Sequence, residues 1–137
     1  MSSPRVAIVA GLRTPFAKRL GGLAERSALE LGVGCVRELL ARTGLAKELE
    51  RVVFGQVVPS LHGPNVAREL VLDTGLPPTV DAHSVSAGCV TSYVATIELA
   101  RAIAAGDVDA GLCGGTDSVS DVPIAVSRPL ARALVAN

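Results

Sequence analysis

Residues 80–120 read VDAHSVSAGCVTSYVATIELARAIAAGDVDAGLCGGTDSVS, and this stretch decides the fold. Its first part, Val80 to Ser86, is typical of a strand, and a turn of small residues then ends at Cys89. The apolar segment from Val90 to Ala105 predicts a helix, and Val108 to Gly114 predicts another strand. A cysteine at a helix start lies near unpaired backbone N–H groups and the positive end of the helix dipole, which favour a thiolate. Cys89 is therefore the best candidate nucleophile.

The predicted helix from Val90 to Ala105 has no clean polar stripe, because its apolar side chains surround most of its axis. It is also far too short to span a membrane. A short helix that is apolar on nearly all sides belongs in the interior of a layered protein. We therefore expect Cys89 to lie at the tip of a buried helix.

Several motifs of this stretch, taken in order, resemble the active-cysteine region of thiolases. The resemblance includes the small residues around Cys89, a Gly-Asp turn at 106–107, and CGGTDSVS at 113–120, which is similar to the family pattern A-G-G-x-E-x-M-S. Asp117 stands where the family usually has Glu, and Val119 where it usually has Met. Residues 83–85 and 120–124 are most similar to the thiolase subunit of fatty-acid β-oxidation complexes. Upstream, RTP at 13–15 and GPNVAR at 63–68 also resemble thiolase segments.

The composition fits one compact domain of 137 residues. Thirteen basic and thirteen acidic side chains cancel, which predicts neither a nucleic-acid partner nor an anionic membrane surface. The apolar run near the start is too brief for a signal peptide, so a cytoplasmic location is expected. Three widely spaced cysteines, at 35, 89 and 113, predict reduced thiols and neither a disulfide framework nor a metal site.

Strands and helices alternate along the rest of the chain. Ser27 and Glu30 form a predicted capping box for a helix that stops at Gly44. A further helix begins near Asn65 and ends at Gly75. Together with the central stretch, the pattern predicts a mainly parallel sheet whose ligands gather at the carboxyl ends of the strands, where Cys89 lies. The four predicted strands are 5–10, 51–55, 80–86 and 108–114.

The remaining cysteines and histidines have structural interpretations. Cys35 lies beside the apolar face of its helix and Cys113 in a strand, so both are expected in the core. His62 and His83 are the only histidines. Since the turn at residues 87–88 breaks the strand alternation before the cysteine, His83 is expected to be a structural histidine rather than the base for Cys89.

The thiolase resemblance implies an α/β thiolase-like fold of which this chain holds the incomplete N-terminal half. The implied order is βαβαβαβ, with a mainly parallel or mixed sheet and helices on both faces. Residues 1–124 would form the first thiolase-fold half without its last strand, and residues 125–137 would begin the loop domain. The absent parts would normally cover a sheet edge and a helix face, so exposed apolar surface is expected.

The resemblance also implies an acyltransferase, in which Cys89 carries the acyl group as a thioester and its backbone N–H donates to the oxyanion. Acyl-CoA and coenzyme A are then substrates, with no bound cofactor and no metal. A homodimer or tetramer is expected, and a hydratase/dehydrogenase subunit of β-oxidation is a further expected partner. The activating histidine and second cysteine of the family have no counterparts here, so the chain alone is expected to be inactive. Two alternatives are a non-catalytic thiolase-like module and a condensing enzyme of the ketoacyl-synthase type.

Overall fold

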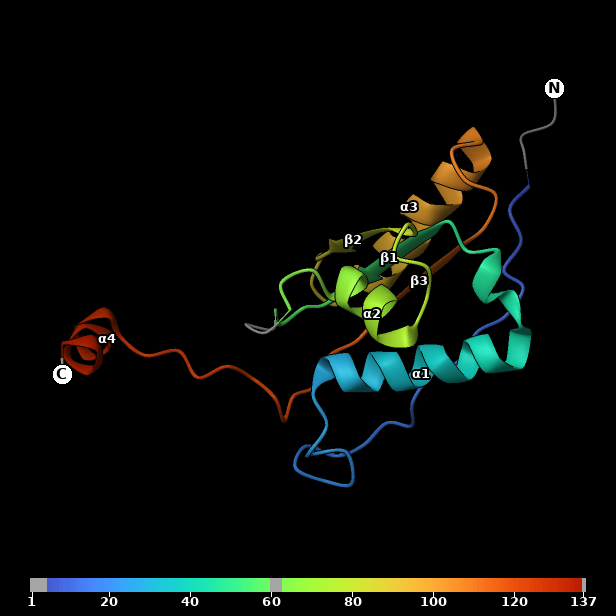
Figure 1. Cartoon of the computed structure of the whole chain (residues 1–137). Coiled ribbons are helices and arrows are strands. Elements are labelled where there is room, and N and C mark those ends of the chain that lie inside the picture. Colours follow the sequence, from blue (N-terminus) through green and yellow to red (C-terminus); the bar gives the residue numbers. More distant parts are fainter. Residues whose placement is uncertain (1–4, 60–62, 137) are drawn as a thin grey trace.

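The computed structural model describes residues 5–59 and 63–136. Its three strands form a parallel sheet in the order β2-β1-β3, and helices connect them (Figure 1). This arrangement confirms the predicted α/β class. The elements in chain order are α1 (Ala28–Thr43), the short 3-10 helix η1 (Leu45–Lys47), β1 (Arg51–Gly55), α2 (Val66–Thr74), β2 (Asp81–Val85), α3 (Thr91–Ala105), β3 (Gly111–Gly115) and α4 (Arg128–Val135).

The central strand β1 divides the core into two layers. Its side chains alternate, so that Val52 and Phe54 pack with α1 and α2 on one face while Val53 packs with α3 on the other. Val52 and Val53 are fully buried. A central parallel strand reads as a continuous apolar run for this reason, since both of its faces are covered by helices.

Local signals in the sequence fix the ends of α1 and α2. The Ser27 hydroxyl accepts a hydrogen bond from the Glu30 N–H at 3.1 Å, and the Glu30 carboxylate accepts one from the Ser27 N–H at 2.8 Å. The predicted capping box is therefore confirmed. Asn65 caps α2, and Gly44 and Gly75 end the two helices in the left-handed region, at φ values of 69° and 76°.

The predicted first strand is wrong for this structure. Residues 5–10 are extended but form no ladder with the sheet, and the segment is exposed along its length. Ile8 is 84% exposed. The reason is that a strand needs a neighbour's unpaired N–H and C=O groups, whereas a groove separates this segment from the open edge of β3. The sheet has three strands in the described residues instead of the predicted four.

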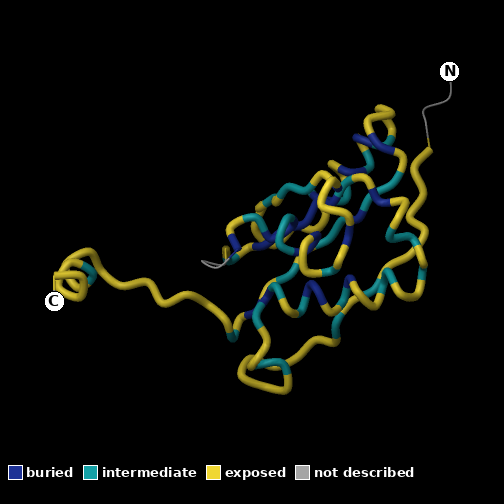
Figure 2. The backbone as a smooth tube through the Cα atoms, viewed as in Figure 1, coloured by how far each residue is buried: buried dark blue, intermediate teal, exposed yellow. Residues whose placement is uncertain are grey.

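The helix α3 is buried on one face only, which corrects the expectation of a fully interior helix. Thr91, Ala95 and Leu99 face the sheet, whereas Tyr93 is 73% exposed and Ile97 is 50% exposed. Much of its apolar surface thus has no cover in this chain. Figure 2 shows residues 121–136 as almost entirely exposed, with a linker that leads to α4, a helix with no buried residue.

Candidate active site

Cys89 lies in a tight turn between the end of β2 and the start of α3. The turn contains Gly88 in the left-handed region, at a φ of 58°, and Val90 is the N-cap residue of α3. Helical geometry therefore begins at Thr91, one residue later than predicted, and Cys89 directly precedes the N-cap. The Cys89 thiol is free and the residue is exposed. A nucleophile in this position has an open approach from solvent.

The side chain of Thr91 closes this turn. Its hydroxyl accepts a hydrogen bond from the Ala87 N–H at 2.9 Å and donates one to the Gly88 carbonyl at 2.7 Å. The backbone N–H of Thr91 also donates to the Gly88 carbonyl, at 3.1 Å. Thr91 is itself buried, at 4% exposure. The hydroxyl of this buried side chain thus bonds both of the residues that precede Cys89, in addition to the backbone hydrogen bond of the turn.

The carboxyl ends of the three strands meet beside this turn. Gly55 pairs with both Val85 and Gly115, which are the last residues of β2 and β3. The turn with Cys89 follows Val85 directly, so the candidate nucleophile lies at the edge where parallel sheets bind their ligands. This placement agrees with the sequence prediction.

His83 has a structural partner in α3. Its Nε2 lies 2.6 Å from the Glu98 Oε1, and the pair joins the middle of β2 to the helix. The histidine predicted from the sequence to be structural thus has a partner on the neighbouring helix. His62, the other histidine, lies outside the described residues.

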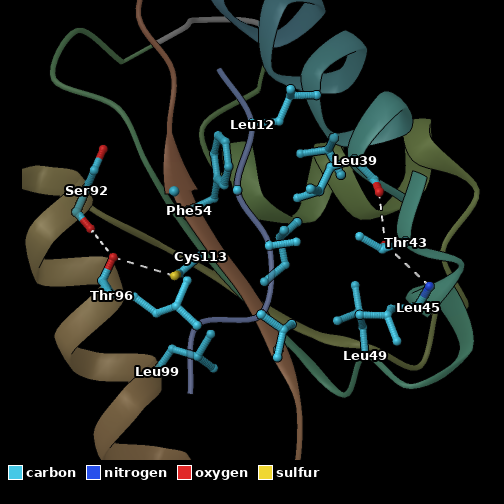
Figure 3. A pocket seen from close by; sticks show the side chains of 18 of the residues that line it. Leu12, Leu39, Thr43, Leu45, Leu49, Phe54, Ser92, Thr96, Leu99 and Cys113 are labelled. Carbon is cyan, nitrogen blue, oxygen red and sulfur yellow. Dashed lines mark hydrogen bonds between the residues drawn. The ribbon is translucent and has the colours of Figure 1, made fainter. Parts of the chain in front are cut away.

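The other two cysteines are only half-buried, which modifies the prediction that both lie in the core. Cys35 is on α1, and burial raises the pKa of its thiol. Cys113 lies on β3, with its sulfur 3.5 Å from the Thr96 hydroxyl. Figure 3 shows the Cys113 side chain pointing into a groove, where Ser92, Thr96 and Leu99 of α3 form one wall.

That groove has a volume of about 430 Å³ and lies along the open edge of β3. The extended residues 6–13 form one side, and Leu39 and Thr43 of α1 contribute to another (Figure 3). The glycine-rich strand β3 presents no charged side chain to it. An uncharged, uncovered strand edge readily pairs with another strand.

Two features of the site were not identified from the sequence. Thr91 and Gly55 contribute to the turn, but their relationship depends on contacts between segments far apart in the chain. An alanine Cβ at position 55 would collide with the Thr91 methyl group and lie 2.8 Å from the Val85 carbonyl oxygen. The available signals were a glycine at the end of a buried strand and a hydroxyl residue two positions after the cysteine.

Comparison with known proteins matches residues 6–136 to the model of the family described as "Thiolase, N-terminal domain". The chain is 49% identical over 136 residues to a 3-ketoacyl-CoA thiolase of Vibrio cholerae, a match that covers 98% of this chain and 31% of the relative. It is 52% identical over 132 residues to a 3-ketoacyl-CoA thiolase of Aeromonas salmonicida, covering 96% of this chain and 30% of the relative. The chain thus spans about a third of the length of these relatives.

Solved structures give the same result for the fold. The acetyl-CoA acetyltransferase of Bacillus anthracis superposes with a TM-score of 0.81 at 26% identity, over 86% of this chain and 30% of that one. The Acat5 thiolase of Ascaris suum, solved in complex with coenzyme A, also gives 0.81 at 29% identity, over 85% of this chain and 31% of that one. No helix in the described residues is long and apolar enough to cross a membrane. The chain belongs to the thiolase family, and it matches the N-terminal domain of that family.

Proposed function

We propose that this chain is the nucleophile-bearing part of a 3-ketoacyl-CoA thiolase, with Cys89 as the nucleophile. The observation that carries the proposal is the position of Cys89: an exposed thiol in a locked turn, at the carboxyl edge of the sheet, in a thiolase N-terminal domain. Relatives at about half identity carry the name 3-ketoacyl-CoA thiolase, which supports the same substrate class.

In the proposed reaction the Cys89 thiolate attacks the 3-keto carbonyl carbon of a 3-ketoacyl-CoA. A bond forms between the sulfur and that carbon, and the bond between the α- and β-carbons breaks, which releases the enolate of acetyl-CoA to be protonated. The thiol of free coenzyme A then attacks the acyl carbon, the bond between that carbon and the Cys89 sulfur breaks, and the shortened acyl-CoA leaves while the Cys89 thiolate is regenerated. Sulfur suits both steps, since it is nucleophilic near neutral pH and its acyl ester stays reactive.

The backbone N–H of Cys89 is the proposed donor to the oxyanion that forms in each addition. The donor belongs to the same residue as the nucleophile, and the closed turn holds the two in a constant relationship. Proton transfers are assigned to an activating histidine and a second cysteine from the remainder of a complete thiolase.

Residues 1–124 are proposed to be the first thiolase-fold half without its last strand, and residues 125–137 the start of the loop domain. The groove beside β3 supports this division, because strands pair about 4.8 Å apart and an uncharged edge faces an unoccupied space. A returning strand in the groove would give residues 5–10 the ladder partner that they lack. The exposed apolar side chains of α3, including Tyr93 and Ile97, support burial in a homodimer or tetramer.

A chimera tests the proposed function. Residues 1–137 of this chain replace the matching 31% of the Vibrio cholerae 3-ketoacyl-CoA thiolase, which is 49% identical over this region. We expect the chimera to cleave 3-ketoacyl-CoA and to form an acyl thioester that peptide mass spectrometry locates at Cys89. The Cys89→Ser chimera should form none, while the Cys35→Ser chimera should keep the activity of the unmodified chimera.

Two results would contradict the proposal. An assembled chimera that never acylates Cys89 would favour the non-catalytic module. A chimera that condenses substrates only with loss of carbon dioxide would favour the ketoacyl-synthase type. A hydratase/dehydrogenase subunit of β-oxidation as partner, and a cytoplasmic location, remain predictions from the sequence.

A further inference from the structure

We infer that Thr91 is the positioning residue of the nucleophile Cys89, and that Gly55 provides the space into which the Thr91 methyl group packs. Thr91 touches no substrate in this scheme and acts through the turn that holds Cys89. The inference rests on the proposed role of Cys89, and it adds the feature of the fold that fixes where the sulfur lies.

The turn that contains Cys89 lies between β2 and α3. Gly88 adopts a left-handed conformation, and two backbone hydrogen bonds span the turn, from the Val90 N–H to the Ala87 carbonyl at 3.4 Å and from the Thr91 N–H to the Gly88 carbonyl at 3.1 Å. Neither of them uses the Ala87 N–H, so the turn needs further internal support. Thr91 supplies it with two hydrogen bonds of opposite sense, from the Ala87 N–H at 2.9 Å and to the Gly88 carbonyl at 2.7 Å. One hydroxyl thereby fixes both a donor and an acceptor on the two residues before Cys89.

The contact between Thr91 and Gly55 limits how closely the start of α3 packs on the sheet. The Thr91 side chain enters the core over Gly55, where even a methyl group would collide with its methyl carbon. The Val85 carbonyl oxygen, only 2.8 Å from the same hypothetical carbon, closes the other side. Neither neighbour is the far end of a flexible side chain, so a larger residue at position 55 must displace the start of α3. Because Gly55 has no side chain, the turn with Cys89 can lie this close to the sheet.

These two contacts locate Cys89 relative to both elements that flank it. The hydroxyl ties the turn to the first residue of α3, and the methyl group ties that residue to the end of β1. Attack on a carbonyl requires the nucleophile within a few tenths of an ångström of its productive place, and a displacement of about 1 Å can cost on the order of a hundredfold in rate. A loosened turn should therefore reduce turnover more than substrate binding.

Three variants, measured in the chimera described above, separate these contributions. Thr91→Val keeps the branched shape over Gly55 but removes both hydrogen bonds. Thr91→Ser keeps the hydroxyl and removes only the methyl group. Thr74→Val is the matched control, because the Thr74 hydroxyl also bonds a backbone carbonyl, that of Leu70 at 2.7 Å, but on α2.

We expect Thr91→Val to lower kcat by on the order of tenfold or more, with little change in KM. Thr91→Ser should restore most of the rate, and Thr74→Val should leave kcat unchanged. A fourth variant, Gly55→Ala, keeps the Thr91 hydroxyl but displaces the Thr91 side chain from its place over residue 55, so it should lower kcat as well. A Thr91→Val chimera with unchanged kcat, or one that Thr91→Ser does not rescue, would overturn the inference.

Amide hydrogen exchange of the 137-residue chain tests the hydrogen bond from the Ala87 N–H to the Thr91 hydroxyl without requiring acyl transfer. The Ala87 N–H should exchange faster in Thr91→Val than in the native chain, and Thr91→Ser should restore its protection. An unchanged Ala87 exchange rate would overturn the inference whatever Cys89 does. The chimera without substitutions could fail to acylate Cys89 while the Ala87 exchange rate rises in Thr91→Val and falls again in Thr91→Ser. That result would contradict the proposed function but would support the role of Thr91 in holding the turn.

Discussion

The carboxylate of Asp117 accepts hydrogen bonds from the backbone N–H of Val57 at 3.0 and 3.1 Å. The N–H of Val58 donates to the same carboxylate at 3.0 Å. The segment after β3 is thus fastened to the segment after β1, at the edge of the sheet where Cys89 also lies. Asp117 is the acid of the segment that resembles the thiolase motif with glutamate, and in this chain the shorter acid forms the link.

Removal of this carboxylate should weaken the fold. Because hydrogen bonds to a charged group contribute more than neutral ones but this group is exposed, Asp117→Ala should lower the free energy of unfolding by about 1–2 kcal/mol. Asp117→Asn, which keeps one acceptor oxygen, should lower the free energy of unfolding by less than Asp117→Ala does. Urea unfolding measures both, with Asp121→Ala in the same segment as control. Equal losses for Asp117→Ala and Asp121→Ala would contradict the proposed link.

The sequence predicted those elements whose signals are local. Ser27 and Glu30 are three residues apart, and this spacing predicts the start of α1. A glycine marks the end of α1, and another marks the end of α2. Hydrogen bonds within four residues determine these features, so neighbouring side chains are sufficient to predict them. The parallel sheet followed from the alternation of strands and helices.

The features that sequence reasoning missed depend on distant contacts. Residues 5–10 have the composition of a strand, but a strand exists only beside a partner, and the edge of β3 lies across a groove. Likewise Gly55 and Thr91 are 36 positions apart, and their contact is visible only after β1 and α3 pack together. The position of Cys89 was predicted, but the contacts that hold it were not.

Two glycines should respond to alanine in opposite directions. A Cβ at position 111 would lie 2.5 Å from Leu99 Cδ1 and 2.7 Å from the Arg51 carbonyl oxygen, whereas at position 34 nothing lies within 4 Å. Gly111→Ala should therefore lower the free energy of unfolding by about 1–3 kcal/mol. Gly34→Ala, within the exposed side of α1, should raise it by about 0.5–1 kcal/mol. Thermal unfolding of both variants tests the pair, and a stabilising Gly111→Ala would contradict the tight packing of β3 against α3.

Cys113 can report whether the groove is filled. In the 137-residue chain its half-buried sulfur lines the groove, so a small alkylating reagent should modify it. In the chimera, the proposed returning strand would cover it and slow its modification at least tenfold, an order-of-magnitude expectation for a buried thiol. Peptide mass spectrometry gives both rates, with Cys35, which does not line the groove, as the internal reference. Equal Cys113 rates in the two proteins would contradict the proposed occupant of the groove.

Cys35 should make the fold less stable at alkaline pH. Burial raises the pKa of its thiol in the folded chain, so the unfolded chain releases this proton at a lower pH. Its contribution to stability is fully present below the ordinary thiol pKa of about 8.5 and is lost as the pH rises through the folded value. Cys35→Ser should therefore flatten the alkaline side of the stability profile, while Cys113→Ser serves as the comparison. An unchanged alkaline slope in Cys35→Ser would show that burial has no such effect.

The capping box of α1 gives the opposite dependence on pH. The Ser27 N–H donates to the Glu30 carboxylate and holds the pKa of that carboxyl below its ordinary value of about 4.3. The stabilisation is complete above the unfolded pKa and is lost as the pH falls through the lower, folded value. Glu30→Gln should thus flatten the acid side of the profile of stability against pH. Ser27→Ala, which removes the cap hydroxyl, should lower the free energy of unfolding by about 1 kcal/mol at neutral pH.

Urea unfolding between pH 3 and 7, a range chosen to bracket an ordinary carboxyl pKa, measures both. Glu25→Gln is the control because it removes a nearby carboxylate outside the box, and an acid slope that this control reduces as much as Glu30→Gln does would contradict the assignment.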